Sequence, residues 1–226
     1  MKFTYYGHAC FSVVIKGKTI VFDPFIKPNE LAKHINLDDI SADYIFVSHG
    51  HIDHIGDCKE LAKQTKATVV SGYEVSEWLC KEGVEKSHPM NHGGKWKFDF
   101  GTAKCTSAVH SSALPDGKNG GNPMGFIITS DEKNFYYSGD TALTMDMQLV
   151  PRWAKLDFAV LPVGDNYTMG YEDAIEAAKM VECSTIVGVH YDTFEFIKID
   201  KQQAKDAFTK AGFTLHLPDI GATIDV

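Results

Sequence analysis

The pattern of hydrophobic and polar positions divides this chain into short sheet-forming blocks separated by helices. Runs rich in β-branched and aromatic residues predict strands, and apolar positions at helical spacing predict helices. Strands are expected over residues 2–6, 10–15, 19–22, 44–47, 67–70, 95–100, 103–109, 125–130, 134–138, 158–163, 185–189, 213–217 and 223–226. Helices are expected around residues 61–62 and over 75–80, 172–181 and 200–211.

Sheet-rich blocks therefore alternate with helices twice along the chain. This order fits two sheets packed face to face with helices outside, an αββα sandwich, although periodicity alone also fits other layered α/β folds. The 226 residues are enough for one sizeable core, so we expect a single domain over residues 1–226. Residues 110–124 are crowded with glycine, proline and asparagine and predict a long loop, which we interpret as a flap over a functional site.

The composition limits the binding partners and the cellular location that we expect. The chain has 22 basic and 30 acidic residues, a net charge of −8, and no basic cluster, which disfavours a nucleic-acid surface but leaves a homo-oligomer open. The five cysteines are scattered without a C-x-x-C pair, which predicts reduced, mostly buried thiols. No signal-peptide pattern and no membrane-spanning run is found, so the sequence predicts a cytoplasmic protein that does not enter the membrane.

Four potential metal ligands follow the strand predicted over residues 44–47. They lie in the run Ser48-His49-Gly50-His51-Ile52-Asp53-His54, where Gly50 permits a tight turn. A strand end with a tight turn can aim imidazoles and a carboxylate at one point, whereas on a helix His49 and His51 would not face each other. Three of the 10 histidines fall in this run, which makes chance a poor explanation. The run predicts a metal site.

The spacing His49-x-His51-x-Asp53-His54 resembles the H-x-H-x-D-H signature of the metallo-β-lactamase superfamily, and the resemblance covers nearly the whole chain. The family pattern requires three later ligands at the ends of β-rich runs, and His110, Asp140 and His190 occur in that order. Alone, each would more often be a core histidine or a turn aspartate. The resemblance implies a four-layer αββα fold with two divalent metal ions. It assigns His49, His51 and His110 to one ion, Asp53, His54 and His190 to the other, and Asp140 to both.

Further motifs are similar to a small bacterial and archaeal branch of uncharacterised metal-dependent hydrolases near the ascorbate-6-phosphate lactonases. These motifs are Gly7-His8-Ala9-Cys10-Phe11, Asp23-Pro24-Phe25-Ile26, Gly121-Asn122-Pro123-Met124-Gly125 and the stretch 162–170. His8 is a candidate catalytic residue that orients substrate or donates to an oxyanion, with a packed structural histidine as the equal alternative. Asp23 and Asp165 are expected to form turns or to hold a ligand imidazole. His34, His88, His92 and His216 are read as ordinary surface or partly buried residues.

The metal pair implies hydrolysis by a hydroxide shared between the ions, with Asp53 also taking the proton from the nucleophile. The site charge of about +1 favours an anionic or carbonyl-containing small-molecule substrate. Zn²⁺ suits the histidine-rich set, and Mn²⁺, Fe²⁺ and Ni²⁺ are compatible with it.

The function expected from this chemistry is hydrolysis of a small ester, lactone or phosphodiester. The runner-up is a nuclease or cyclic-nucleotide phosphodiesterase, which the acidic charge and the short length disfavour. A glutathione thioesterase is disfavoured because the last third continues to alternate strands and helices. A di-iron redox protein would tend to carry glutamate at position 51, and a non-catalytic metal sensor fits a complete ligand set poorly. β-Lactam hydrolysis does not follow from the superfamily alone.

Overall fold

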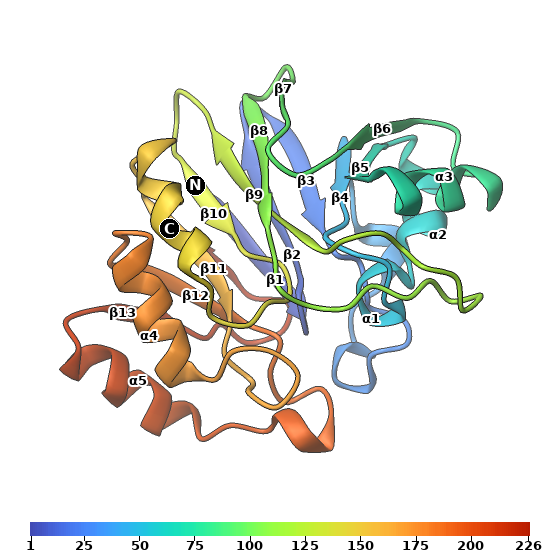
Figure 1. Cartoon of the computed structure of the whole chain (residues 1–226). Helices are drawn as coiled ribbons and strands as arrows, with labels where there is room; N and C mark the ends of the chain where they lie inside the picture. Colours follow the sequence, from blue (N-terminus) through green and yellow to red (C-terminus); the bar gives the residue numbers. More distant parts are fainter.

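Two seven-stranded sheets form the centre of the molecule in the computed structural model, which describes residues 1–226 (Figure 1). The first sheet runs in the order β14 (Thr223–Asp225), β1 (Lys2–Gly7), β2 (Cys10–Ile15), β3 (Lys18–Phe22), β4 (Tyr44–Phe46), β5 (Thr68–Gly72) and β6 (Ser87–Met90). The second runs in the order β13 (Thr214–His216), β12 (Thr185–Val189), β11 (Phe158–Pro162), β10 (Phe135–Tyr137), β9 (Met124–Thr129), β8 (Thr102–Ser107) and β7 (Lys95–Lys97).

Helices cover the outer faces of both sheets, which confirms the predicted αββα sandwich (Figure 1). On the first sheet lie α1 (Ile52–Ile55), α2 (Cys58–Thr65) and α3 (Tyr73–Lys81), and on the second lie α4 (Tyr171–Met180) and α5 (Lys201–Lys210). Short 3₁₀ helices occur at η1 (Glu30–Ala32), η2 (Leu37–Asp39), η3 (Met145–Arg152) and η4 (Glu195–Ile197). No helix has both the length and the apolar character needed to cross a membrane.

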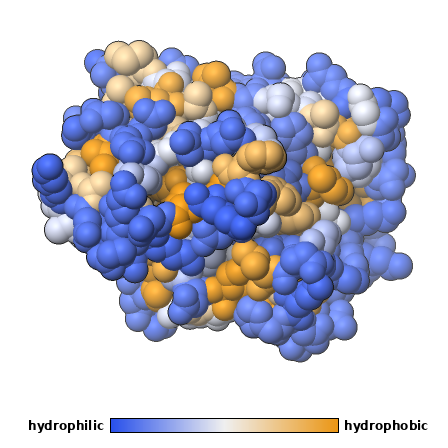
Figure 2. Space-filling view, turned by 90° about the horizontal axis from the view of Figure 1, so that it is seen from below, coloured by the Kyte–Doolittle hydropathy of each residue, from blue (hydrophilic) through white to orange (hydrophobic).

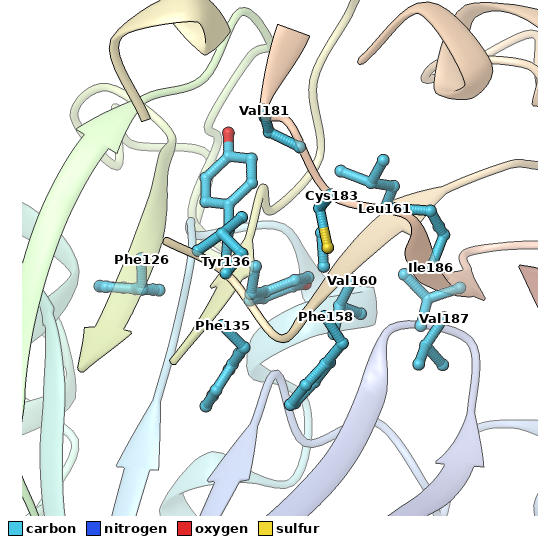
Figure 3. Packing of buried hydrophobic residues seen from close by; sticks show 14 of the residues in the cluster. Phe126, Phe135, Tyr136, Phe158, Val160, Leu161, Val181, Cys183, Ile186 and Val187 are labelled. Atoms are coloured by element: carbon cyan, nitrogen blue, oxygen red, sulfur yellow. The ribbon is translucent and has the colours of Figure 1, made fainter. Parts of the chain in front are cut away.

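The core lies between the sheets and is rich in aromatic side chains. Rings of Phe3, Phe11 and Phe22 stack along the first sheet with centroids 4.8 and 4.6 Å apart. From the second sheet, Phe135 stacks on Phe158 at 4.8 Å, and Figure 3 shows these two rings beside Val160 and Phe126. These rings lie on the inner faces of the sheets, whereas a second cluster that includes Val21, Ile45 and Leu61 lies between the first sheet and its helices. Central strands such as β11 are buried on both faces.

Several predicted boundaries were wrong. The strands expected over residues 95–100 and 103–109 are shorter, because the chain turns between Phe98 and Gly101 and β8 ends at Ser107. Strand β6 was missed because Ser87-His88-Pro89-Met90 has neither alternation nor β-branched residues. The helices η1, η2 and η4 were also missed, since three residues leave no periodicity to detect, and the longer η3 contains Pro151, which argues against a helix. All five cysteines are free and only Cys80 is exposed, as expected.

Candidate metal centre

The candidate ligands meet because strands from both sheets end at the same edge of the sandwich. In the first sheet, β1, β3 and β4 run in one direction and are followed by His8, Asp23 and the run 48–54. In the second sheet, β8, β10 and β12 also run in one direction and are followed by His110, Asp140 and His190. Carboxyl ends of strands with a common direction lie at one edge, so residues far apart in sequence converge there.

The first cluster of donor atoms joins His49, His51 and His110, whose nearest ring nitrogens all lie within 4.8 Å of one another. The Nε2 atom of His49 is 2.9 Å from Nδ1 of His51. The His110 ring lies 5.2 Å from that of His49 and 5.1 Å from that of His51. His49 is buried and the other two are partly exposed, so the cluster faces the surface on one side.

The second cluster joins Asp53, His54, His190 and also His8 within the same 4.8 Å limit. The Asp53 Oδ2 atom lies 2.9 Å from Nε2 of His8, 3.8 Å from Nε2 of His54 and 3.9 Å from Nε2 of His190. Asp53 and His54 lie in the one-turn helix α1 rather than in the tight loop that the sequence predicted. This single helical turn keeps Asp53 and His54 close to His51, which immediately precedes the helix.

Asp140 lies between the two clusters. Its Oδ2 atom is 2.9 Å from Nε2 of His190, 3.2 Å from Nε2 of His54 and 3.7 Å from Nε2 of His110. Burial alone would raise the pKa of Asp140, but His190 and His54 hold that pKa well below its usual range. The carboxylate is therefore ionised and shared by donors from both clusters.

The donor set fits a divalent cation. His54 is fully buried and donates from Nδ1 to Asp23, while its Nε2 faces Asp140 without a hydrogen-bond partner. Burial alone would lower the pKa of His54, but Asp140, Asp23 and Asp53 raise it well above its usual range, so this position favours a cation, and a metal ion at Nε2 would take the place of a proton. Burial lowers the pKa of His49 well below its usual range, which keeps that imidazole in the neutral form a metal needs. Neutral imidazoles and ionised carboxylates are the ligands of zinc and related metals.

One buried carboxylate, Asp23, orients a ligand in each cluster. It accepts directly from His54 Nδ1 at 2.8 Å and from Ser48 Oγ at 2.6 Å. Ser48 Oγ in turn lies 2.9 Å from Nδ1 of His49, and Tyr137 donates to the same Asp23 oxygen. Asp23 therefore holds the imidazole of the candidate ligand His54 by its other ring nitrogen, the contact that the sequence predicted for it.

Asp165 instead forms a turn, with a backbone φ of 63° and its Oδ1 accepting from the N–H of Asn166. It is exposed and contacts no imidazole. Of the histidines expected to lie outside the site, His34 is exposed and His88, His92 and His216 are partly exposed, and none of them joins a donor cluster.

The surroundings of His8 differ from those expected of a group that touches substrate. Its side chain is fully buried, and burial lowers its pKa to about 3, so the ring is neutral. The ionised Asp53 must accept from Nε2, which leaves Nδ1 to accept from the Thr193 hydroxyl at 3.0 Å. Both ring nitrogens are engaged, and the contact of His8 with the candidate ligands is its hydrogen bond to Asp53.

The loop over residues 110–124 crosses the first cluster, as the sequence predicted for a loop beside the site. Ser112 Oγ accepts from the N–H of Gly50 at 3.1 Å, and Ser111 Oγ lies 3.3 Å from Nε2 of His51. An isolated bridge between Ala113 and Asn119 closes the loop on itself. Its mobility as a flap stays a prediction.

A cleft of about 770 Å³ opens beside the clusters. It is lined by His51, Asp53, His110 and Asp140 together with Phe25, Pro28, Ile52, Ser111, Tyr167, Phe194, Glu195 and Phe196. The sequence motifs include Phe25, Ser48, Ile52 and Tyr167 but assign them no role, and Pro28, Thr193, Phe194 and Phe196 lie outside every motif. No short-range signal marks these last four residues, because they reach the site only through the packing of separate loops.

Comparison with known proteins also indicates a metal-dependent hydrolase. The family model described as "Beta-lactamase superfamily domain" matches residues 18–191. A UPF0173 metal-dependent hydrolase of Flavobacterium johnsoniae is 48% identical over 226 residues, covering 100% of both chains. A second one, from Bacillus cereus, is 45% identical over 208 residues and covers 90% of this chain and 91% of that protein.

Solved structures of metal-dependent hydrolases are also similar to this chain. The metallo hydrolase Igni18 from the archaeon Ignicoccus hospitalis superposes with a TM-score of 0.89 at 34% identity, covering 99% of this chain and 97% of that chain. The isothiocyanate hydrolase from Delia radicum gut bacteria shares the fold, with a TM-score of 0.80 at 20% identity over 100% of this chain and 99% of that chain.

Proposed function

This chain belongs to the β-lactamase superfamily and is a metal-dependent hydrolase, and from that premise we propose that it acts through a dinuclear site on a small ester, lactone or phosphodiester. One observation carries the proposal. Two clusters of metal-ligating atoms, one of three imidazoles and one of imidazoles and a carboxylate, lie on either side of the buried, ionised Asp140. A single ion would leave one cluster without a partner.

The proposed ligands follow from this arrangement. One ion would be held by His49, His51 and His110, the second by Asp53, His54 and His190, and Asp140 would contact both. When bound, the ions would polarise the bond under attack and lower the pKa of the attacking water. The histidine-rich donor set favours Zn²⁺, and Mn²⁺, Fe²⁺ and Ni²⁺ suit the same atoms.

The protein's own groups supply orientation and proton transfer. Asp53 lines the cleft and its side chain is 19% exposed, so we assign it the proton that the attacking water releases. His8 donates to Asp53 Oδ2 and is a positioning residue that keeps the carboxylate turned toward the cleft. Conversion of Asp53 to asparagine should therefore weaken binding of the second ion and also lower turnover, while the first cluster keeps its ligands.

The runner-up functions find less support. No lysine or arginine lines the cleft, although a nuclease needs cations along the phosphate backbone. Position 51 carries histidine rather than the glutamate expected of a di-iron redox protein. The last third forms β11, α4, β12, α5, β13 and β14, which belong to the sheets and their covering layer rather than to an added helical domain.

Metal analysis of the purified protein, followed by assays with bis(p-nitrophenyl) phosphate, a p-nitrophenyl ester and a lactone, tests the proposal. We expect two equivalents of metal per chain and hydrolysis of at least one of these substrates. The variant His110→Ala removes a ligand from the first cluster and should lower the stoichiometry toward one and abolish turnover. The variant His216→Ala, which removes a partly exposed histidine of β13, serves as the matched control.

The outcomes separate the two parts of the proposal. One equivalent of metal in the wild type, unchanged in His110→Ala, would contradict the dinuclear site. Full metal loading without hydrolysis of any of the three substrates would instead favour a non-catalytic metal sensor.

A further inference from the structure

The wall of the cleft is apolar, and it comes from four separate segments of the chain. Phe25 and Pro28 follow β3, Ile52 begins α1, Tyr167 follows β11, and Phe194 and Phe196 flank the start of η4. Phe196 is 70% exposed and Ile52 is 56% exposed, although burial of such side chains is normally favourable. Apolar side chains that converge from distant segments beside a polar centre form a binding surface rather than scattered surface residues.

This wall is attached to the metal centre. The ring of Phe25 lies 5.6 Å from the His8 ring, and the ring of Phe194 lies 5.3 Å from it. His8 in turn contacts Asp53 at 2.9 Å. The apolar wall and the ligands therefore line one continuous cleft, and a molecule placed at the ligands has apolar surface directly beside it.

The charge of the cleft also limits what enters it. No lysine or arginine lines it, and the carboxylate of Glu195 is paired with Lys198 at 2.6 Å. Phosphate groups are normally recognised by arginine or lysine beside any metal, and this wall offers none. Figure 2 looks from below at the view of Figure 1 and shows hydrophobic residues gathered in patches between polar ones.

We infer that the substrate is a neutral carboxylic ester, open or cyclic, whose acyl group is a hydrocarbon chain or ring that packs on the wall formed by Phe25, Pro28, Ile52, Tyr167, Phe194 and Phe196. The inference rests on the proposed function. In the reaction, the oxygen of water bonds to the acyl carbon and the bond to the ester oxygen breaks. The alcohol leaves with one proton of the water, and the acid is the other product.

Burial of the acyl chain gives the reaction a chain-length dependence. Each methylene moved from water onto an apolar surface should improve kcat/KM about two- to fourfold, through KM in particular. A set of p-nitrophenyl esters from acetate through butyrate and hexanoate to octanoate, assayed with the metal-loaded protein, measures this gain. Bis(p-nitrophenyl) phosphate in the same assay should be cleaved less efficiently than the hexanoate ester.

Substitutions in the wall connect the gain to particular residues. We expect Phe196→Ala to lower the ratio of kcat/KM for hexanoate to that for acetate at least threefold and Phe196→Leu to restore part of it. The matched control is Trp96→Ala, which removes another exposed aromatic side chain, 54% exposed on β7 and outside the cleft. The control should leave the ratio unchanged.

A flat chain-length series, or a ratio that Phe196→Ala does not alter, would overturn the inference while the proposed function stands. So would faster cleavage of the phosphodiester, or an oligomer in sedimentation that Phe196→Ala dissociates without altering the ratio. If no ester or phosphodiester is cleaved, the proposed function fails. Calorimetric binding of octanamide and acetamide then tests the wall directly, and equal affinities for the two amides would overturn it.

Discussion

Replacement of Asp23 by asparagine tests whether one buried carboxylate orients ligands in both clusters. Asp23 is fully buried and accepts from the Ser48 N–H, the Ser48 hydroxyl, the His54 Nδ1–H and the Tyr137 hydroxyl. An amide of the same shape keeps one acceptor oxygen but turns two N–H donors toward these groups. The hydroxyls can rotate and accept, whereas His54 must move its proton to Nε2. That proton would occupy the lone pair proposed to bind metal.

The size of the effect follows from the kind of contact that is lost. Removal of a carboxylate that holds a ligand imidazole typically lowers metal affinity 10- to 100-fold, or about 1.4–2.8 kcal/mol. We expect a loss in this range for Asp23→Asn in a zinc competition titration against a chromophoric chelator, with circular dichroism verifying the fold. Metal affinity is the right measurement because it does not depend on the identity of the substrate.

Asp57→Asn is the matched control for this substitution. Asp57 is also a buried aspartate near the site, but its Oδ2 accepts from the backbone N–H groups of Ile26 and Lys27 and contacts no imidazole. It should change stability while leaving zinc affinity within about twofold of wild type, well short of the 10-fold effect expected for a lost ligand contact. Wild-type affinity in Asp23→Asn, or an equal loss in both variants, would refute the assignment of Asp23.

Two further substitutions test the framework that carries the site. A Cβ atom at Gly164 would lie 2.1 Å from the carbonyl oxygen of His190, so Gly164→Ala should cost about 1–3 kcal/mol in urea unfolding and weaken zinc binding. Gly72→Ala would meet only the flexible end of a methionine side chain, and a similar loss there would contradict the argument. Phe22 is fully buried among aromatic rings of both sheets, so Phe22→Ala should cost about 3–5 kcal/mol in the same assay; the exposed Val14→Ala should cost far less.

The sequence predicts those parts of the site that depend on local order. The run 48–54 is dense enough to indicate a metal by itself, and His110, Asp140 and His190 could be found because each follows a β-rich run. Runs of β-branched and aromatic residues also predict the strands, and the alternation of these runs with helices predicts two sheets covered by helices. The family resemblance groups the candidate ligands, and in the structure the same donor atoms lie close together, with His8 added to the second group.

Other features depend on contacts between segments that no local pattern connects. The Thr193 hydroxyl reaches His8 across 185 positions of sequence, and the Tyr137 hydroxyl reaches Asp23 across 114. Histidine is a residue type that often takes part in catalysis, so the sequence makes His8 a candidate. Only the packing around His8 shows that both of its ring nitrogens are engaged. The apolar wall was not predicted for the same reason, because Phe25 lies in a motif without an assigned role, Phe196 lies in none, and only the fold brings both to one cleft.

The two parts of the site have different structural origins. His8, Asp23 and His190 follow strands of the sandwich with φ angles of 54°, 41° and 58°, a region that costs a non-glycine residue about 1–3 kcal/mol. Such conformations persist only where the surroundings hold them, and here the N–H of His190 donates to the carbonyl of His8 across the two sheets. The ligand geometry is thus fixed by the core, whereas most of the apolar wall lies on connecting loops. Loop substitutions should therefore change substrate preference while the metal centre stays intact.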